Sequence, residues 1–461
     1  VCGVSLTALL LLLALARRGW GARGTQTQGA LPPGPTPLPQ LGNLLQLESR
    51  RLDRALMELS GRWSPVFTMR LGPHPAVVLC GYSALRDALV LQADAFSGRG
   101  FSNASLAETV SIVFSNGRRW PTLRNFAMGA LKEFGLGTRT IEERILEERG
   151  AFYPVLFPLP GAPFDPRRLL DNAVSNVICS DPEFLRLLDL FHDNFRIMSS
   201  RWGLMYNIFP SLLDWLPGPH HRIFQNFTEL RVFISERTQR HQQTRQPGEP
   251  HDFIDCFLDQ MDKEQEDPES HFQEETLVMT THNLFFGGTE TTSTTLRYGL
   301  LILLKYPEMA AKVQAELDAV VGWMHTPRLE DRERLPYTSA VLHEIQRLIS
   351  VLPLGLPRAL TRDTHLRGYI LPKGTFVIPL LMSSHRDPTQ FKDPDCFNPT
   401  NFLDDKGNFQ SNDAFMPFAP GLGQEGRGQG WAGPQRHGAH PASLCPQESG
   451  CAWVQAWRDQ R

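Results

Sequence analysis

The longest apolar stretch of the chain runs from Gln273 to Tyr306 and is hydrophobic on most sides of a helical projection. A helix with this distribution is buried rather than placed at the surface. At a rise of about 1.5 Å per residue, the stretch would form a helix roughly 50 Å long, enough to cross a whole domain. Pro307 follows and cannot continue a helix. The pattern therefore predicts a long buried helix around which the rest of the chain packs.

The centre of this predicted helix is unusual for a core helix. Gly287 and Gly288 are adjacent, and each costs about 1 kcal/mol relative to alanine. An acid and a run of hydroxyl residues follow in positions 289–295, and such groups need partners when they are buried. In one interpretation the helix is kinked and the hydroxyls bond to carbonyls four residues earlier. In the other, a flat ligand lies against the glycines while Glu290 and Thr291 handle protons.

Shorter patterns predict the other elements. Apolar positions at helical spacing indicate helices that begin in Asn116–Phe126 and that cover Glu308–Val321 and Thr338–Leu348. Two short strands, Phe67–Leu71 and Ala76–Cys80, flank a turn at residues 72–75. Gly368–Pro379 is typical of a β-hairpin around Pro372-Lys373-Gly374.

The N-terminus begins with an apolar run, Val1–Ala16, followed by Arg17 and Arg18. The run is slightly short for a spanning helix, which needs about 20 apolar residues. A cleaved signal peptide is the alternative, but basic residues precede the apolar run of a signal peptide rather than follow it. We interpret residues 1–18 as an uncleaved anchor whose following segment stays cytoplasmic. Residues 19–40 form a basic and proline-rich hinge, since LPPGPTPLPQ is stiff, irregular chain.

The composition excludes some classes of function. A net charge of −3 gives no indication of nucleic-acid binding. The seven cysteines are scattered and odd in number, which argues against a disulfide framework and a zinc site. We expect a reduced, cytosol-facing protein.

The Gly-Gly-Thr-Glu-Thr sequence at 287–291 resembles the oxygen-binding groove in the central helix of the haem-thiolate monooxygenases, the cytochromes P-450. The resemblance extends from about Leu31 to Gly421, and is greatest to the mammalian microsomal drug- and steroid-oxidising family. It implies a mainly α fold with a minor β part, with residues 41–421 as the haem-monooxygenase-like domain. It also implies haem as cofactor, small lipophilic substrates, an NADPH-dependent reductase as partner, and the cytoplasmic face of the endoplasmic reticulum membrane as location.

The same resemblance implies roles for individual residues. Glu290 and Thr291 would relay protons, while Trp120 and Arg124, four residues apart on one helix face, and Arg358 would hold the haem propionates. Leu352–Pro357 resembles a strand that enters the substrate pocket. Phe114, although such an aromatic is more often simply core, would contact substrate together with Asn283, Phe286, Gly287 and Leu352.

Glu344 and Arg347 match the Glu-x-x-Arg pair that the family buries behind its haem. By spacing alone they are an ordinary pair on one helix face. The family's third, cationic partner corresponds here to Asn401, which donates hydrogen bonds but carries no charge. We therefore expect a weakened three-residue interaction.

The resemblance fails at the end of the chain. In the family, the segment from Ala414 onward contains a Phe-x-x-Gly-x-Arg-x-Cys-x-Gly motif that leads into an apolar helix. With Phe418 and Gly421 in register with its Phe and first Gly, Gly423 holds the arginine position and Glu425 the cysteine position here. Residues 422–461 lack helical periodicity and are typical of a disordered tail, as expected for a shifted reading frame. Cys445 and Cys451 lie in this tail. A thiolate ligand favours O–O cleavage, and the harder carboxylate of Glu425 would not reproduce that effect.

Two earlier segments also depart from the family pattern. Three prolines in Tyr153–Pro160 would shorten a helix, and a Phe-Gly-x-x-Phe segment is missing at Cys179–Asp181. The sequence thus predicts a cytochrome P-450 scaffold with an altered end and without family activity. The alternatives are a membrane-anchored, non-catalytic haem- or ligand-binding relic and an unstable product of a decayed gene.

Overall fold

The computed structural model describes residues 31–39, 41–47, 51–100, 112–134, 139–156, 165–179, 183–246, 248–322 and 326–420. The predicted anchor and the predicted tail lie outside these residues. The chain divides into two compact units. Within the described residues, the first unit contains the chain up to residue 100 and Leu356–Leu380, and the second contains residues 112–355 and 381–420.

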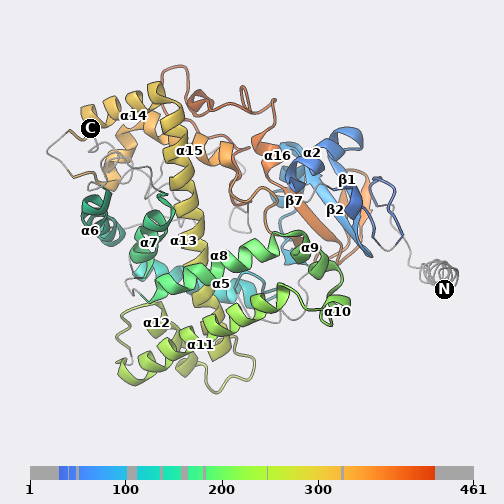
Figure 1. The fold of residues 1–461 in the computed structure, drawn as a ribbon, viewed down its shortest axis with the longest axis horizontal. Helices are drawn as coiled ribbons and strands as arrows, with labels where there is room; N and C mark the ends of the chain where they lie inside the picture. The colour runs from blue at the N-terminus through green and yellow to red at the C-terminus, as the bar shows by residue number, and fades with distance from the viewer. Residues whose placement is uncertain are drawn as a thin grey trace. The chain divides into compact units, whose positions relative to one another are not determined.

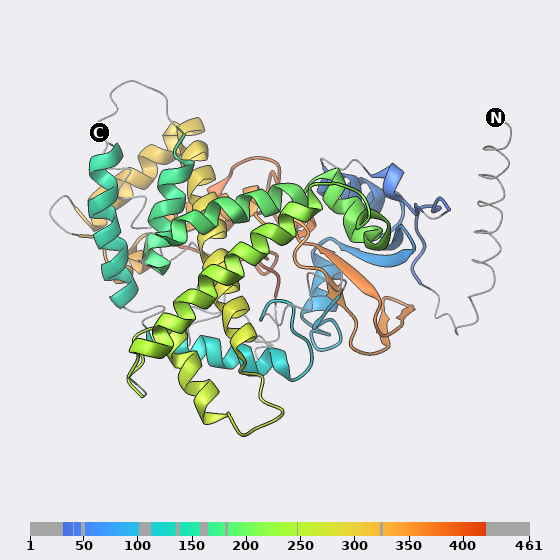
Figure 2. The same cartoon turned by 60° about the horizontal axis from the view of Figure 1, so that its bottom comes forward.

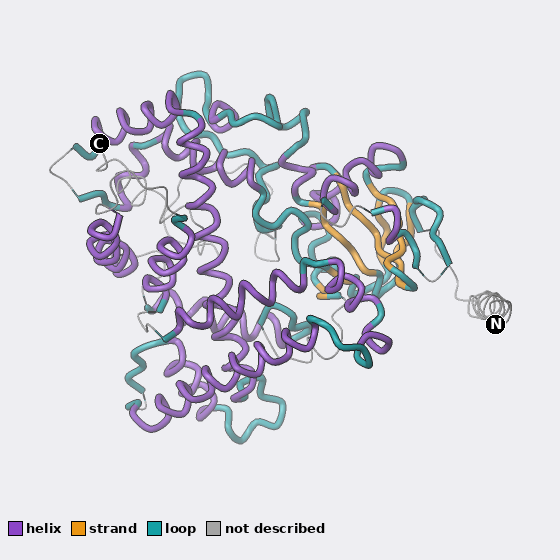
Figure 3. The backbone as a smooth tube through the Cα atoms, viewed as in Figure 1, coloured by secondary structure: helices purple, strands orange, loops and turns teal. Residues whose placement is uncertain are grey.

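The first unit carries the strands, which are orange in Figure 3. Its five-stranded sheet has the order β1-β2-β7-β4-β3, and β5 and β6 form a separate two-stranded sheet. The strands are β1 (Val66–Leu71), β2 (His74–Cys80), β3 (Gly98–Arg99), β4 (Arg358–Ala359), β5 (Thr364–Leu366), β6 (Tyr369–Leu371) and β7 (Phe376–Leu380). The helices of this unit are η1 (Leu44–Gln46), α2 (Leu52–Arg62) and α3 (Tyr82–Leu89).

The two N-terminal strands are confirmed, because β1 and β2 pair antiparallel across a turn at Gly72. The predicted hairpin at Gly368–Pro379 is wrong. Its first arm, β6, pairs with β5 across Arg367 and Gly368, both of which have positive φ, as a tight hairpin turn requires. Its second arm, β7, instead pairs with β2 and β4.

The second unit is built from helices (Figure 1). They are α5 (Arg119–Glu133), α6 (Arg139–Leu156), α7 (Arg167–Ile178), α8 (Phe184–Met198), α9 (Arg201–Ile208), α10 (Pro210–Leu213), α11 (His220–Thr244), α12 (Phe253–Lys263), α13 (Glu274–Lys305), α14 (Pro307–Val320), η2 (Leu329–Arg334), α15 (Pro336–Ile349), α16 (Met382–His385) and η3 (Pro399–Phe402). The mainly α fold with a minor β part is therefore confirmed.

The long helix predicted from the apolar pattern is α13, and its position at the core of the second unit is confirmed. It packs against α7, α11, α12, α14 and α15. It also contributes side chains to four hydrophobic clusters, through Leu277, Phe285, Leu296 and Leu303 among others. Figures 1 and 2 show α8 and α11 next to it from two directions.

Leu352–Pro357 is not a strand, because two prolines interrupt it and Gly355 takes a positive φ in a turn closed by its N–H on Leu352 O. The strand β4 begins only at Arg358. Helix α6 includes Pro154, and the rest of the proline-containing segment after Leu156 lies outside the described residues, so the predicted shortening of this helix stays a prediction. Among the described residues, none of the helices is both long enough and apolar enough to cross a bilayer.

Candidate functional site

Two hydroxyl residues at the centre of α13 bond to their own helix, whereas Thr289 Oγ1 is buried without a hydrogen-bond partner among the described residues. Thr291 Oγ1 donates to the carbonyl of Gly287 at 2.8 Å, and Thr295 Oγ1 donates to that of Thr291 at 2.8 Å. These bonds agree with the first interpretation of the sequence, in which hydroxyls bond to carbonyls four residues earlier. Gly287 also keeps open space beside it, since a Cβ atom there would meet nothing within 4 Å. The groove that the second interpretation requires thus remains compatible with the same helix.

The side chain of Glu290 has other hydrogen-bond partners than that of its neighbour Thr291. Its Oε2 lies 2.8 Å from Nε2 of His192 on α8, and Thr294 Oγ1 donates to its Oε1 at 3.3 Å. Burial opposes ionisation of Glu290, but the hydrogen bond and charge of His192 outweigh it, so the pKa of Glu290 is lowered. The hydrogen bond to Glu290 raises the pKa of His192. Both shifts favour the ion pair of protonated His192 with ionised Glu290.

Asp171 on α7 is the third ionisable group of this cluster. Its Oδ2 lies 3.8 Å from His192 Nε2, and its side chain is 8% exposed. Burial raises the pKa of Asp171, although hydrogen bonding to Ser293 and the charge of His192 oppose the rise. The cluster joins α7, α8 and α13. His192 and Asp171 were not predicted as site residues, because nothing in their local patterns distinguishes them from other polar residues on amphipathic helices.

The predicted substrate residues have different environments. Asn283 and Phe286 lie half-buried on α13, and Phe286 stacks on Phe195 of α8 with ring centroids 4.7 Å apart. Leu352 lies in the turn that follows α15 and is also half-buried. Phe114 is 40% exposed, so the alternative that it is a core residue is wrong.

Trp120 and Arg124 lie on one face of α5, as their spacing predicts. The guanidinium carbon of Arg124 is 5.6 Å from the centroid of the Trp120 ring. The stacked cation and the indole N–H are both suited to an anionic oxygen.

Arg358, in the first unit, has a cationic neighbour, Arg99, that was not predicted from the sequence. Arg358 on β4 is paired in register with Arg99 on β3, so the two side chains lie directly across from one another. Burial, followed by the charge of Arg99, lowers the pKa of Arg358 to about 10, and burial also lowers that of Arg99. Arg358 is buried and Arg99 is half-buried, and two neighbouring cations of this kind are suited to an anion.

The sequence does contain an indication that Arg99 is special, because Gly98 and Gly100 flank it in the segment FSGRG at residues 96–100. A Cβ at Gly98 would come within 2.6 Å of the carbonyl oxygen of Ala359, and one at Gly100 within 2.8 Å of that of Arg358. Only glycine allows β3 and β4 to approach so closely.

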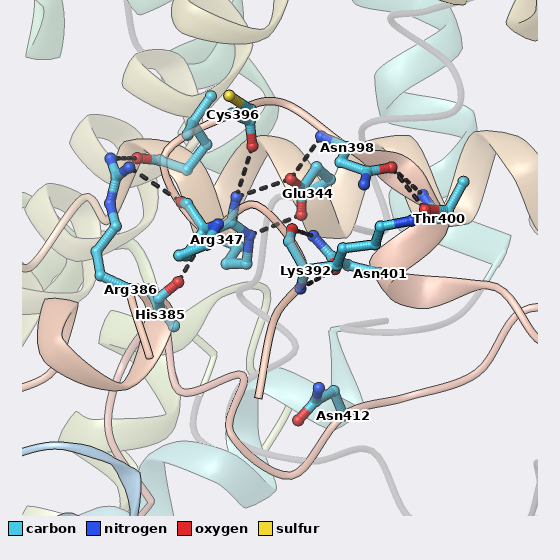
Figure 4. Close-up of polar contacts among 12 residues, drawn as sticks. Glu344, Arg347, His385, Arg386, Lys392, Cys396, Asn398, Thr400, Asn401 and Asn412 are labelled. Atoms are coloured by element: carbon cyan, nitrogen blue, oxygen red, sulfur yellow. Dashed lines mark hydrogen bonds and ion pairs between the residues drawn. The ribbon is translucent and has the colours of Figure 1, made fainter. Parts of the chain in front are cut away.

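Glu344 and Arg347 form an ion pair in which neither side chain has exposed surface (Figure 4). Arg347 Nε and Nη2 donate to the two carboxylate oxygens of Glu344 at 2.7 and 2.8 Å. The remaining guanidinium N–H groups donate to backbone carbonyls of His385, Pro394 and Cys396 at 2.7, 2.7 and 3.0 Å. All five donors of the guanidinium are thus satisfied, which a buried arginine requires.

The third partner of this ion pair is not the predicted one. The backbone N–H of Asn398 donates to Glu344 Oε1 at 2.8 Å. The Asn401 side chain instead bonds to the backbone of Lys392, accepting from its N–H at 2.8 Å and donating to its carbonyl at 3.2 Å (Figure 4). The expectation that Asn401 takes part in the ion pair is therefore wrong. A backbone group has taken the place of a side chain, and residue types do not reveal such a partner.

His385 connects this network to the segment that precedes Gly421. Burial and the charges of Arg347 and Arg386 lower the pKa of His385 to about 3, so the ring is neutral. Its Nε2 accepts the N–H of Met416 at 3.0 Å, which places the ring proton on Nδ1, 2.8 Å from Ser350 Oγ. Ser384 Oγ donates to the carbonyl of Ala414 at 2.7 Å. These bonds fix the start of Ala414–Gly421, the last segment that matches the expected pattern.

One group of metal-type ligands occurs among the described residues: His241, Asp252 and Asp255. His241 Nδ1 lies 2.8 Å from Asp255 Oδ1, and its Nε2 lies 3.5 Å from Asp252 Oδ2. Asp252 also caps α12 by accepting the N–H of Asp255. The imidazole bridges two carboxylates, so the group fastens the end of α11 to the start of α12.

The expected position of a thiolate ligand, Glu425, lies outside the described residues. The described cysteines are Cys80, Cys179, Cys256 and Cys396. Cys80 belongs to β2, and its thiol contacts Ser60 at 3.0 Å. Burial raises the pKa of the Cys256 thiol to about 11, which makes it a poor thiolate.

The fold and these residues define a haem-monooxygenase scaffold, and comparison with known proteins supplies the family. The cytochrome P450 family model matches residues 32–423. Cytochrome P450 2F2 of Mus musculus is 51% identical over 433 residues, covering 91% of this chain and 88% of that protein. Cytochrome P450 2F1 of Homo sapiens is 49% identical over 430 residues, covering 91% and 87%. Cytochrome P450 2B4 of Oryctolagus cuniculus is 45% identical over 408 residues, covering 86% and 83%.

The chain therefore belongs to the cytochrome P450 family, as its sequence motifs predicted. That family consists of haem-dependent monooxygenases that act on lipophilic substrates with electrons from a redox partner. The match to the family model ends at residue 423, two positions before Glu425.

Proposed function

We propose that residues 41–421 form a microsomal monooxygenase scaffold, and that this chain does not carry out the family's oxygen insertion. The observation that carries the proposal is Glu425 at the position of the haem-ligand cysteine, with Gly423 at that of the arginine. A thiolate gives electron density to iron and promotes O–O cleavage, which a carboxylate does not reproduce.

Support for the scaffold comes from the fully bonded pair of Glu344 and Arg347. Its partners tie α15 to α16, to residues 394–398 and, through His385, to Met416. The chain is therefore positioned up to the point at which the cysteine loop of the family begins. A family-type loop attached there would start from an ordered base.

The residues that would hold haem carboxylates suit that task. Arg358 is a buried cation with the half-buried Arg99 directly across from it, and Trp120 with Arg124 presents a separate donor set. A propionate would neutralise the repulsion between the two arginines. The open space beside Gly287 suits the approach of a flat group to α13. Bound haem would supply the family's oxidative chemistry.

Glu290 and Thr291 are the residues we propose for proton handling, with His192 as the group that positions Glu290. The Thr291 hydroxyl holds its place by donating to Gly287. The carboxylate of Glu290 is held on the side of α13 that faces α8. Delivery of a proton would require Glu290 to leave His192, so this contact would control the availability of the acid.

The proposed substrates are small and lipophilic, and Phe114, Asn283, Phe286, Gly287 and Leu352 are the residues we expect them to contact. The proposed electron donor is an NADPH-dependent reductase. Val1–Ala16 followed by Arg17 and Arg18 supports a single N-terminal anchor in the endoplasmic reticulum membrane, with the catalytic domain on the cytoplasmic face.

The carbon monoxide difference spectrum of the reduced, full-length protein tests the central proposal, because it distinguishes sulfur from nitrogen or oxygen ligation of haem iron. We expect no thiolate-type spectrum. A thiolate-type spectrum that Cys445→Ala or Cys451→Ala abolishes would show that a tail cysteine has become the ligand. One that survives both substitutions would refute the assignment of Glu425 to the ligand position.

A ligand-binding relic without turnover is the second candidate. The rings of Phe191, Phe195, Phe227, His282 and Phe286, which lie between α8, α11 and α13, favour it because they need no haem. Haem content after purification separates this candidate from an enzyme, and resistance to proteolysis separates it from an unstable product.

A further inference from the structure

The imidazole of His241, in the last turn of α11, uses its two nitrogens differently. Its Nδ1 lies 2.8 Å from Oδ1 of Asp255, whose side chain is 5% exposed. An ionised carboxylate can only accept hydrogen bonds, so Nδ1 carries a proton and donates to Asp255. In the neutral ring, Nε2 therefore keeps the lone pair that a metal ion requires.

This Nε2 atom faces a carboxylate oxygen of Asp252 at a separation that suits a shared metal ion. Oδ2 of Asp252 lies 3.5 Å from Nε2, which is longer than the roughly 2.7–3.2 Å of an N–H···O hydrogen bond. The other oxygen, Oδ1, accepts the N–H of Asp255 at 3.0 Å and caps α12. A zinc ion about 2.1 Å from both atoms, with a tetrahedral angle between them, would hold them about 3.4 Å apart.

Asp255 supports the orientation of the ring. A histidine that binds a metal usually donates its other N–H to a carboxylate, which fixes the tautomer and the direction of the free nitrogen. Asp255 has this role towards His241, and its own Oδ2 is held by the N–H of His251 at 3.0 Å. The side chains of His241 and Asp252 are 30% and 45% exposed, so water and ions reach both ligand atoms from solvent.

The charges around the site favour a cation. Burial, followed by the charges of Glu133, Asp259, Asp252 and Asp255, raises the pKa of the adjacent Cys256 thiol to about 11. The electrostatic potential beside the site is therefore negative.

The nearby Arg245 does not take the place of such a cation. Its guanidinium forms ion pairs with Asp259 and Asp262, which lie farther along α12. The carboxylate of Asp252 forms no ion pair with it among the described residues.

We propose that His241 Nε2 and Asp252 Oδ2 bind a divalent transition metal ion of the zinc class, with water as the remaining ligands and Asp255 as the positioning residue. A nitrogen ligand disfavours magnesium and calcium, which prefer oxygen. The ion would clamp the end of α11 to the start of α12, which lie side by side (Figure 1). The inference is independent of haem and of the proposed function, because none of its residues belongs to that site.

Protection of His241 from diethyl pyrocarbonate tests the proposal on the unmodified, full-length protein. The reagent acylates neutral imidazole nitrogens, and peptide mass spectrometry measures the reaction of each histidine separately. We expect micromolar zinc to stop the reaction of His241, since the lone pair of Nε2 would be bound. His365, exposed on β5, is the control in the same digest and should react at an unchanged rate. An absence of protection at millimolar zinc would overturn the proposal.

Two variants of α12 with the same change of charge separate a ligand from a general field. Asp252→Asn keeps the helix cap, because Asn caps as well as Asp does. It should raise the zinc concentration for half-protection of His241 roughly tenfold or more, because a neutral amide is a poorer zinc ligand. Asp262→Asn removes a carboxylate that is 63% exposed and is not a ligand, so it should leave the half-protection concentration unchanged. Equal effects of the two substitutions would refute the site.

Two further comparisons test the positioning residue and the choice of metal. Asp255→Asn should raise the half-protection concentration by about tenfold or more, as expected for loss of the carboxylate behind a metal-bound histidine. Magnesium at the same concentrations should leave His241 reactive. Protection by magnesium equal to that by zinc would show an adventitious ion only and would overturn the proposal.

Discussion

His192 on α8 and Glu290 on α13 form an ion pair, with 2.8 Å between Nε2 and Oε2. The pair makes the acid proposed for proton handling also a structural link between two helices. The exposed fractions of the two side chains, 36% and 31%, keep the ion pair within reach of solvent. Its strength should therefore depend on pH and on salt.

The contribution of this pair to stability should be largest in mildly acidic solution. The raised pKa of His192 means that its contribution is complete below about pH 6.5 and is lost as the pH rises through the folded-state pKa. The lowered pKa of Glu290 means that its contribution is lost as the pH falls below about 4.3. Asp171 adds to the attraction for protonated His192, and Arg297 on α13 favours the carboxylate of Glu290.

Urea unfolding of the wild type and of His192→Gln at pH 5.5 and pH 8.5 measures this effect. The substitution should cost about 1 kcal/mol or less at pH 5.5 and still less at pH 8.5, because the pair is partly solvated. Glu290→Gln should remove the same pH dependence, and the double variant should lose no more than either single variant. A cost for His192→Gln that does not change with pH would contradict the ion pair.

The buried pair of Glu344 and Arg347 predicts a much larger effect. Replacing Arg347 by Ala leaves the Glu344 carboxylate without its counter-ion and three backbone carbonyls without their donor. The loss should amount to about 3–5 kcal/mol of the free energy of unfolding. Arg347→Lys should restore little, because an ammonium group cannot reproduce the planar arrangement of five donors.

The ion pair of Arg386 with Asp395 is the matched control for Arg347→Ala, since the Asp395 side chain is 89% exposed. Asp395→Ala should change the free energy of unfolding by less than about 1 kcal/mol. Denaturant unfolding followed by circular dichroism compares the variants. Equal costs for Arg347→Ala and Asp395→Ala would show that the buried pair is not a stabilising centre of the second unit.

The apolar pattern was sufficient to place α13, because a helix buried on nearly all sides leaves a long and unambiguous signal. The strand prediction was wrong where the pairing of a strand depends on residues that are distant in the sequence. Tyr369–Leu371 and Phe376–Leu380 are both strand-like and flank a turn, yet they pair with different partners. Local residue types do not determine which distant edge a strand joins.

The sequence motifs identified important residues, but they did not identify all the partners of those residues. Glu344 and Arg347 are adjacent on one helix face, so their spacing determines their contact. Their other partners are backbone groups of residues 385–398, which no residue type reveals. His192 and Asp171 reach Glu290 from other helices, and their contact depends on the packing of α7, α8 and α13.

The N-terminal run predicts the behaviour of the whole chain in cell fractions. Val1–Ala16 followed by Arg17 and Arg18 should hold the protein in membranes after extraction with alkaline carbonate. A variant with two Leu→Asp substitutions in residues 9–13 should become soluble, because charge in the middle of an apolar segment is costly in a bilayer. Recovery of the unaltered protein in the soluble fraction, with its N-terminus intact, would contradict the anchor.

Replacement of the chain after Gly421 should restore thiolate-ligated haem. The bonds from His385 and Ser384 fix the backbone at Met416 and Ala414, so an added cysteine loop would begin from a defined position. A chimera with a family-type cysteine loop and terminal helix should bind haem and give a thiolate-type carbon monoxide spectrum. The same chimera with serine at the cysteine position is the control, and should lack that spectrum.

If the cysteine chimera stays free of haem, the departures at Tyr153–Pro160 and Cys179–Asp181 disable the scaffold as well. If it binds haem but Arg358→Leu does not reduce the haem content, Arg358 and its neighbour Arg99 are not the propionate site.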